Sequence, residues 1–224
     1  MATILVTGAS RGIGLELACQ YAEAGDKVIA TCRDPDAANA LNHLRQSYST
    51  VEVQALDVVD PLSIHSLASL LSKRSEKLDM LINNAGMLAH EKAGEWTAEA
   101  FSATLDTNVV GPALMMQAFA KVMASGAKMI NISSGLGSFG MAIDFGGPTG
   151  TYAASKAALN MVVCQLAPYL REKGITAVAF NPGWVKTDMG GQEATLTPQE
   201  SVTALRASFE KLTPEMAGKF IDYN

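Results

Sequence analysis

The sequence predicts a single-domain Rossmann-type fold, in which a doubly wound parallel sheet of about seven strands carries helices on both faces. Three observations lead to this fold class. Short apolar runs rich in Ile, Val and Leu recur along the chain and are mostly continuous, as parallel strands covered on both faces require. Helical stretches separate these runs, which gives a repeated β-α unit. A glycine-rich turn follows the first run.

The apolar runs define the expected strands. Because crossovers between parallel strands are right-handed, the loops after the strands meet at the carboxyl edge of the sheet, where such sheets bind ligands. The strands are expected at Thr3–Thr7, Lys27–Cys32, Val51–Leu56, Met80–Asn83, Lys128–Ser133, Ile175–Phe180 and, more weakly, Lys219–Asp222.

Helices are expected between the strands. Ile13, Leu17 and Tyr21 fall on one face of the helix that follows the glycine-rich turn. Asp34-Pro35 and Asp60-Pro61 are expected to begin helices, with Asp as the cap and Pro at the first helical position. A further apolar face is expected from Leu62, Leu67, Leu70 and Leu71.

Length and composition set limits on the class of protein. The 224 residues suffice for the core of one domain, 1–224, and would be tight for two. With 48% hydrophobic and 17% charged residues, the chain is expected to be a compact globule, neither disordered nor a coiled coil. A formal net charge of −5 argues against a nucleic acid or an anionic membrane as the main partner.

The sequence indicates a cytoplasmic protein without a metal site. The N-terminus runs directly into an apolar strand with no leader pattern, and no apolar stretch approaches the length of about 18 residues that a membrane span needs. Three widely spaced cysteines without a C-x-x-C pair fit a reducing compartment. The three histidines do not cluster.

The glycine-rich turn is the first candidate for binding. Gly8 allows a tight turn, Gly12 lets backbone N–H groups approach a pyrophosphate, and Gly14 lets the next helix sit close to the sheet. The spacing is G-x-x-x-G-x-G and not the commoner G-x-G-x-x-G. A plain tight turn is the alternative, but the position between a strand and a helix favours a dinucleotide site.

The end of the second strand predicts the cofactor. An acidic residue there accepts hydrogen bonds from the ribose of NAD, whereas a basic residue accommodates the 2′-phosphate of NADP. Here the strand ends in Cys32-Arg33, and Arg11 is expected to project towards the same place. Two guanidinium groups suit a phosphate, so NADP(H) is predicted. In the alternative, Arg33 is solvated or pairs with Asp34 or Asp36.

Tyr152 and Lys156 form the candidate catalytic pair. In a helix, a spacing of four residues places both side chains on one face. A neighbouring cation lowers the pKa of a phenol from about 10, which would make Tyr152 a general acid. The alternative is an ordinary solvated helix face, on which this spacing is common.

Several motifs together resemble the short-chain dehydrogenase/reductase family. They are the Thr-Gly-x-x-x-Gly-x-Gly turn, Asn83-Asn84-Ala85-Gly86, a serine before Tyr-x-x-x-Lys, and Asn181-Pro182-Gly183. The resemblance covers essentially the whole chain, in order and at compatible spacings. Within the family, the short length and the long segment before the tyrosine are most similar to carbonyl reductases of the sniffer and C-factor type.

The resemblance implies catalytic roles for four residues. Tyr152 would donate a proton to a carbonyl oxygen, and Lys156 would hold the nicotinamide ribose and lower the pKa of the tyrosine. Ser134 would hydrogen-bond the carbonyl, with Ser133 as the alternative. Asn108 would hold a water molecule that links the lysine to solvent, or would be an ordinary helix asparagine.

The resemblance also implies a set of cofactor contacts. Asp57, with Val58 beside it, would contact the adenine, and residues 84–86 would line the adenosine ribose unless they form a merely structural turn. The backbone of Val185 and the hydroxyl of Thr187 would anchor the carboxamide and the pyrophosphate. With the catalytic Tyr152 and Lys156, the remaining cofactor contacts are expected at Gly8, Ser10, Arg11, Gly12, Ile13, Gly14, Arg33, Asn84, Ala85, Gly86, Pro182 and Gly183.

The chain departs from the family pattern in two places that concern the substrate. The 16 residues from Gly135 to Gly150 must loop out between Ser134 and Tyr152 and are expected to border the pocket, and the segment Asp188–Pro198 is short for a lid. An apolar ketone, aldehyde or quinone is expected because the residues placed at the mouth are mostly apolar. These are Met87, Leu88, Phe139, Met141, Phe145, Trp184 and Met189, with His90, Asp144, Lys186 and Asp188 as the polar exceptions; Trp184 is expected to be a wall near the nicotinamide.

The sequence therefore predicts an NADPH-dependent carbonyl reductase. A dinucleotide-binding signalling or regulatory protein with little turnover is the alternative. An extended-type nucleotide-sugar epimerase would need a further domain, for which the chain has no room. Apolar helices at 98–125 and 150–173 favour a homodimer or homotetramer, although a monomer remains open.

Overall fold

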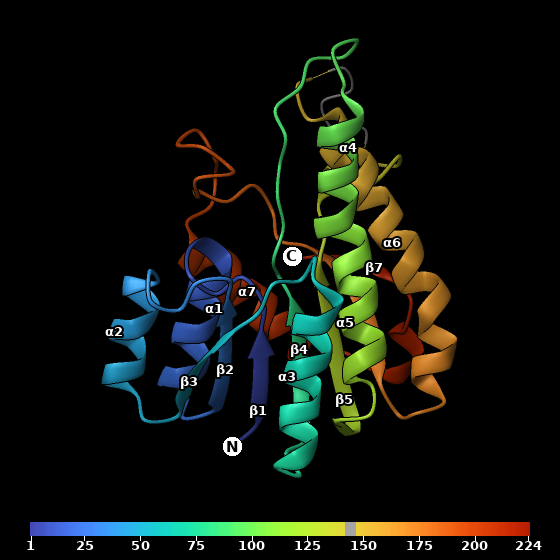
Figure 1. Ribbon diagram of the computed structural model, residues 1–224. Helices are drawn as coiled ribbons and strands as arrows, with labels where there is room; N and C mark the ends of the chain where they lie inside the picture. Colours follow the sequence, from blue (N-terminus) through green and yellow to red (C-terminus); the bar gives the residue numbers. More distant parts are fainter. Residues whose placement is uncertain (142–146) are drawn as a thin grey trace.

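The computed structural model describes residues 1–141 and 147–224 and places seven parallel strands in one sheet (Figure 1). Their order across the sheet is β3-β2-β1-β4-β5-β6-β7, so the chain winds outward from β1 in both directions. This confirms the predicted doubly wound fold. The strands are β1 Thr3–Val6, β2 Lys27–Cys32, β3 Val51–Ala55, β4 Leu78–Asn83, β5 Met123–Ile132, β6 Thr176–Asn181 and β7 Phe220–Asp222.

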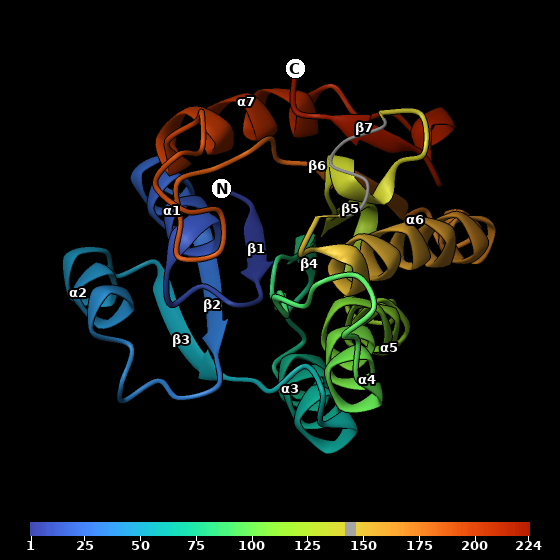
Figure 2. The same ribbon diagram turned by 90° about the horizontal axis from the view of Figure 1, so that it is seen from above.

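Helices cover both faces of the sheet and divide the core into two layers (Figure 2). One layer packs α3, α5 and α6 against the sheet, and the other packs α1, α2 and α7. Continuous apolar strands are required because both of their faces are buried. The helices are α1 Gly12–Glu23, α2 Asn39–Ser47, α3 Pro61–Lys73, α4 Ala98–Leu105, α5 Gly111–Phe119, α6 Gly150–Arg171 and α7 Pro198–Glu210.

Local capping explains one predicted helix start and corrects another. Asp60 caps α3, because its carboxylate accepts a hydrogen bond from the N–H of Leu62 at 2.9 Å with Pro61 at the first helical position. The expected start at Asp34-Pro35 is wrong. The Asp34 carboxylate accepts from the N–H groups of Asp36 and Ala37 and closes a turn, and α2 begins only at Asn39.

The apolar face expected for α3 is partly wrong as well. Leu67 and Leu71 are buried, but the side chain of Leu62 is 77% exposed. Leu62 lies in the first turn of α3, so it extends beyond the part of the helix that packs on the sheet.

Two short helical segments lie next to the candidate site. A π-helical turn η1, Asp106–Val110, joins α4 to α5 and contains the fully buried Asn108. A 3-10 turn η2, Gly135–Gly137, follows β5 directly after Ser134. Single π-turns inside helices occur frequently at functional sites.

The η2 turn packs against the backbone of α6 with no space for a side chain. A Cβ atom on Gly137 would lie 2.7 Å from the N atom of Ala157 and 2.7 Å from the carbonyl carbon of Lys156. Both are backbone atoms, which cannot swing aside as a flexible side chain can. Gly137 therefore sets the separation between the turn after Ser134 and the helix that carries Tyr152 and Lys156.

We expect Gly137→Ala to lower the free energy of unfolding by about 1–3 kcal/mol, because the added methyl group must push η2 away from α6. Urea denaturation measures this change. Gly140→Ala is the matched control in the same loop, since its Cβ would meet no atom closer than Ser138 Oγ at 3.8 Å. Equal stabilities of the two variants would contradict the close packing described for Gly137.

Candidate active site

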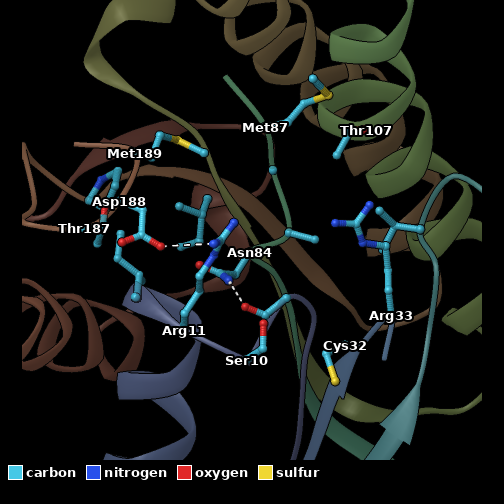
Figure 3. Close-up of a pocket in the computed structure, with 18 of the residues that line it drawn as sticks. Ser10, Arg11, Cys32, Arg33, Asn84, Met87, Thr107, Thr187, Asp188 and Met189 are labelled. Carbon is cyan, nitrogen blue, oxygen red and sulfur yellow. Dashed lines mark hydrogen bonds and ion pairs between the residues drawn. The ribbon is translucent and has the colours of Figure 1, made fainter. Parts of the chain in front are cut away.

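A cleft of about 550 Å³ opens at the carboxyl edge of the sheet (Figure 3). It lies beside β1, where the order of the strands along the sheet reverses direction. This is the position at which doubly wound sheets bind their ligands. Its volume falls in the range of small-molecule sites. The lining brings together most of the residues expected from the sequence: Gly8, Ser10, Arg11, Gly12, Ile13, Arg33, Asp57, Val58, Asn84, Ala85, Gly86, Tyr152, Lys156, Pro182 and Thr187.

The glycine-rich turn has the geometry that a phosphate needs. Gly8 and Gly12 have φ angles of 64° and 56°, a region that favours glycine. A Cβ on Gly14 would lie 2.3 Å from the Gly8 oxygen, so the start of α1 packs directly on the turn. No side chain caps α1 at Arg11, which leaves the first N–H groups of the helix free for an anion.

The Asn84 side chain holds the glycine-rich turn in place through hydrogen bonds to backbone carbonyl groups. Its side-chain N–H group donates to the carbonyl oxygens of Thr7 and Gly8 at 2.9 and 3.1 Å. The Thr7 hydroxyl in return accepts from the N–H groups of Asn84 and Ala85, both at 3.0 Å. The loop after β4 is thus joined to the loop after β1. Asn84 therefore stabilises the glycine-rich turn in addition to lining the cleft.

The expected convergence of Arg11 and Arg33 is wrong in this structure. Arg11 forms an ion pair with Asp188 at 3.0 Å, and Figure 3 shows it turned towards Asp188 and apart from Arg33. Opposite charges attract, and the loop after β6 brings Asp188 to the lip of the cleft. The side chains of Arg11 and Asp188 are both 76% exposed, so the pair is weakly held. Arg33 itself lines the cleft beside the end of β2.

Helix α6 brings Tyr152 and Lys156 together at the inner end of the cleft. The Lys156 ammonium lies 5.4 Å from the centroid of the Tyr152 ring and donates to the carbonyl oxygen of Ile132 at 2.9 Å. Ser134 lies close enough to the Tyr152 phenol to lower its pKa. The three side chains therefore form one cluster between the end of β5 and the start of α6.

Burial sets the protonation of this cluster. It raises the pKa of Tyr152 to about 12, while Ser134 acts in the lowering direction. This is opposite to the lowering expected from Lys156, because removal of the phenolate from water dominates and only Ser134 acts against it. Burial also lowers the pKa of Lys156 to about 8. At pH 7 the phenol is neutral and holds the proton that a general acid must donate.

The structure separates Ser134 from Ser133. Ser133 is buried in the wall of the cleft, and its hydroxyl donates to Asn160 Oδ1 of α6 at 2.6 Å. Ser134 lies close enough to the phenol to lower its pKa. Because the Ser133 hydroxyl is engaged by Asn160, Ser134 is the serine whose hydroxyl can serve the reaction.

Asn108 is committed to protein groups. Its Oδ1 accepts from the N–H of Met87 at 2.8 Å, and its Nδ2 donates to the Met87 carbonyl at 2.9 Å and to Ser155 Oγ at 3.0 Å. A Cβ on Gly86 would lie 3.2 Å from Asn108 Oδ1 and 3.7 Å from Lys156 Nζ. Asn108 thus anchors the loop after β4 to α6 beside the lysine, which is more than an ordinary helix asparagine does.

The mouth of the cleft differs from the sequence expectation. Met87 and Met189 line the cleft, but Phe139 is 88% exposed and Trp184 donates its indole N–H to the Gly190 oxygen at 2.8 Å. Phe145, like Asp144, lies outside the described residues. The contact that sequence reasoning missed is Trp96, whose ring leaves no space for a Cβ on Gly150 at the start of α6.

Within the described parts of the chain, no group of three metal-ligating side chains occurs. None of the helices described is long and apolar enough to cross a membrane.

The fold and the site are those of a Rossmann-type oxidoreductase. The chain belongs to the short-chain dehydrogenase family, whose model matches residues 2–196. It is similar to the NADPH-bound carbonyl reductase from chicken fatty liver, with a TM-score of 0.93 and 36% identity over 100% of this chain and 96% of that chain. The carbonyl reductase Sniffer of D. melanogaster gives a TM-score of 0.91 and 30% identity over 100% and 97%. C-signal of Myxococcus xanthus is 36% identical over 65% of this chain and 89% of its own length.

The buried Lys156 makes stability depend on pH in a predictable direction. Its pKa is about 8 in the folded protein against 10.5 for an ordinary lysine, so folding disfavours the charged form by about 3 kcal/mol. This cost is fully present below pH 8 and disappears as the pH rises to 10.5, because the unfolded chain then loses the same proton.

We expect the free energy of unfolding of the wild type to rise relative to Lys156→Met by about 2–3 kcal/mol between pH 7 and pH 10. Urea denaturation of both ligand-free proteins at the two pH values measures it. The comparison cancels the titration of groups that the two proteins share. A difference that stays constant with pH would show that the ammonium is not desolvated.

Proposed function

We propose that the protein is an NADP(H)-dependent carbonyl reductase. The observation that carries the proposal is the cluster of a neutral Tyr152 phenol, Ser134 and the buried Lys156 ammonium at the inner end of a cleft whose other end is an uncapped helix start. The carbonyl reductases among the similar structures support the same reaction class.

The residues of the site divide the reaction between them. A bound nicotinamide dinucleotide supplies the hydride that reduces the carbonyl carbon. The Tyr152 hydroxyl donates its proton to the carbonyl oxygen, which becomes the alcohol. Ser134 hydrogen-bonds that oxygen as its negative charge develops, and Lys156 supplies a positive charge close to the phenol. Because the phenol is neutral up to about pH 12, the ligand-free site is already protonated for the reductive direction.

The choice of NADP(H) is supported by the end of β2. Arg33 offers a guanidinium group to the cleft, and no ion pair ties it to another part of the described chain. The carboxylate of the next residue, Asp34, is held in its own turn by two backbone N–H groups. A phosphate on the ribose would therefore meet a free cation and not an acceptor.

An apolar carbonyl compound is the substrate class that the mouth supports. Met87 and Met189 line it and can repack around varied shapes. The segment between β6 and α7 contributes Met189 to this lining, together with the polar Lys186 and Asp188. A signalling role like that suggested by the name of C-signal is the second candidate, but a protein that only bound the dinucleotide would not need the protonated phenol.

Tyr152→Phe should lower kcat for reduction of 4-nitrobenzaldehyde by NADPH at least about a hundredfold, because the proton donor is removed and the ring is kept. Loss of NADPH absorbance measures the rate. NADPH binding, followed by fluorescence, should change little. Turnover that survives in the variant would exclude Tyr152 as the acid, and a wild type that binds NADPH but reduces no quinone, aldehyde or ketone would favour the signalling role.

Arg33→Asp should reverse the preference between the two cofactors. The carboxylate repels a 2′-phosphate and accepts hydrogen bonds from a ribose hydroxyl, so kcat/KM should fall about a hundredfold for NADPH and rise for NADH. Arg45→Asp, an exposed charge on α2 outside the cleft lining, is the matched control for the change in net charge. Equal use of both cofactors by the wild type would contradict the proposal.

A further inference from the structure

The last strand, β7, is connected to the turn after Ser134 by the buried side-chain amide of Asn181. Asn181 ends β6, and Asp222 ends β7 beside it in register. Asn181 Nδ2 donates to Asp222 Oδ1 at 3.0 Å, and Asn181 Oδ1 accepts from the N–H of Gly135 at 2.9 Å and from the N–H of Gly183 at 3.3 Å. Asn181 is only 7% exposed, so these partners replace water.

The carboxylate determines which way this amide faces. An ionised Asp222 can only accept hydrogen bonds, so it must meet the NH₂ group of Asn181 and not the oxygen. The oxygen is then turned towards the two backbone donors on the other side. An uncharged, non-accepting residue at 222 would remove that constraint, and the buried Nδ2 would lose its partner.

The hydrogen bonds that begin at Asp222 and pass through Asn181 end at Gly135, directly beside the catalytic cluster. Gly135 follows Ser134, whose hydroxyl accepts from the N–H of Leu136 at 3.2 Å and which lies close enough to the Tyr152 phenol to lower its pKa. On its far side the same turn is stopped by the backbone of α6 at Gly137. The Asn181 amide therefore holds the turn at the residue that directly follows Ser134.

The Gly183 end holds the loop that follows β6. Gly183 has a φ of 79°, and a Cβ there would lie 3.0 Å from Tyr223 Cε1 and 2.6 Å from Leu196 Cδ1. Asp222 Oδ1 also accepts from the N–H of Tyr223 at 2.8 Å, which sets the tyrosine against the glycine. One carboxylate thus governs both the turn after Ser134 and the start of the loop that lines the cleft.

We propose that Asp222 is a positioning residue of the active site, which orients the Asn181 amide and through it the turn that carries Ser134. The proposal rests on the reductase function proposed above, since it assigns Asp222 a role in that reaction. Asp222 touches neither substrate nor cofactor in this role.

The test compares Asp222→Ala with Asp222→Asn, using Ile221→Val as the control. Ile221 packs against the apolar core from the neighbouring position of β7, so its variant weakens the strand without touching the amide. Reduction of 4-nitrobenzaldehyde by Asp222→Ala should show kcat lowered about tenfold, because a small displacement of a catalytic group is costly. Its Kd for NADPH should change less than about threefold. Asp222→Asn should recover most of the rate, since an amide oxygen can accept from Asn181.

The pH profile separates positioning from a general loss of stability. Ser134 lowers the pKa of Tyr152, so a displacement of Ser134 should move the limb that rises with pH to higher pH when Asp222→Ala oxidises 4-nitrobenzyl alcohol with NADP⁺. Ile221→Val should leave that limb in place. An unshifted limb with an unchanged kcat in Asp222→Ala, or an Asn variant no better than the Ala variant, would overturn the proposal.

Amide hydrogen exchange of the ligand-free protein tests the same hydrogen-bond chain without turnover. The Gly135 and Gly183 amides should exchange about tenfold faster in Asp222→Ala and unchanged in Ile221→Val. Faster exchange in a protein that reduces no carbonyl would support the positioning chain and refute the reductase function. Unchanged exchange would refute the positioning chain, whatever the activity.

Discussion

The burial of the Lys156 ammonium at the carboxyl end of β5 is the constraint on which the rest of the site depends. The charge is surrounded by backbone and amide groups: the Ile132 carbonyl accepts from it, and Asn108 Oδ1 lies close by across Gly86. No carboxylate within the described chain contributes to its pKa, which burial alone lowers to about 8. The fold therefore holds a partly compensated cation where a reaction that develops negative charge can use it.

Keeping this cation requires close contacts between backbone segments. Gly137 lets the η2 turn lie against α6, Gly86 leaves room beside the ammonium, and Gly14 lets α1 pack on the turn after β1. A side chain at any of these positions would meet backbone or the catalytic groups themselves. The cost of the buried charge, about 3 kcal/mol in the ligand-free protein, is a large part of the stability of an ordinary domain, so the surrounding packing has little freedom to relax.

The elements that could be predicted from the sequence are those with local causes. Continuous apolar runs place the strands because both sheet faces are covered, and the spacing of Tyr152 and Lys156 follows from helix geometry. Asp60 before Pro61 caps a helix as expected, yet Asp34 before Pro35 closes a turn, since the same carboxylate can satisfy either arrangement.

The features that escaped prediction depend on distant partners. The pKa of Tyr152 rises because the folded chain buries the phenol, whereas the spacing to Lys156 had predicted a lower pKa. Arg11 meets Asp188, which is 177 residues away, and no local pattern could indicate that the two loops would touch. Trp96 against Gly150 and Asp222 against Asn181 are contacts of the same kind.

These distant contacts have one effect in common, because each of them joins a segment of the site to a neighbouring element. The loop after β4 is fastened to the glycine-rich turn by Asn84 and to α6 by Asn108. The turn after β5 is fastened to β6 by Asn181, which β7 orients through Asp222. Three buried or half-buried amides thus connect the loops after β1, β4, β5 and β6. An amide suits this task because it can both donate and accept hydrogen bonds without adding a charge beside the Lys156 ammonium. The one carboxylate among these groups, Asp222, lies on the edge strand β7 and acts through the Asn181 amide.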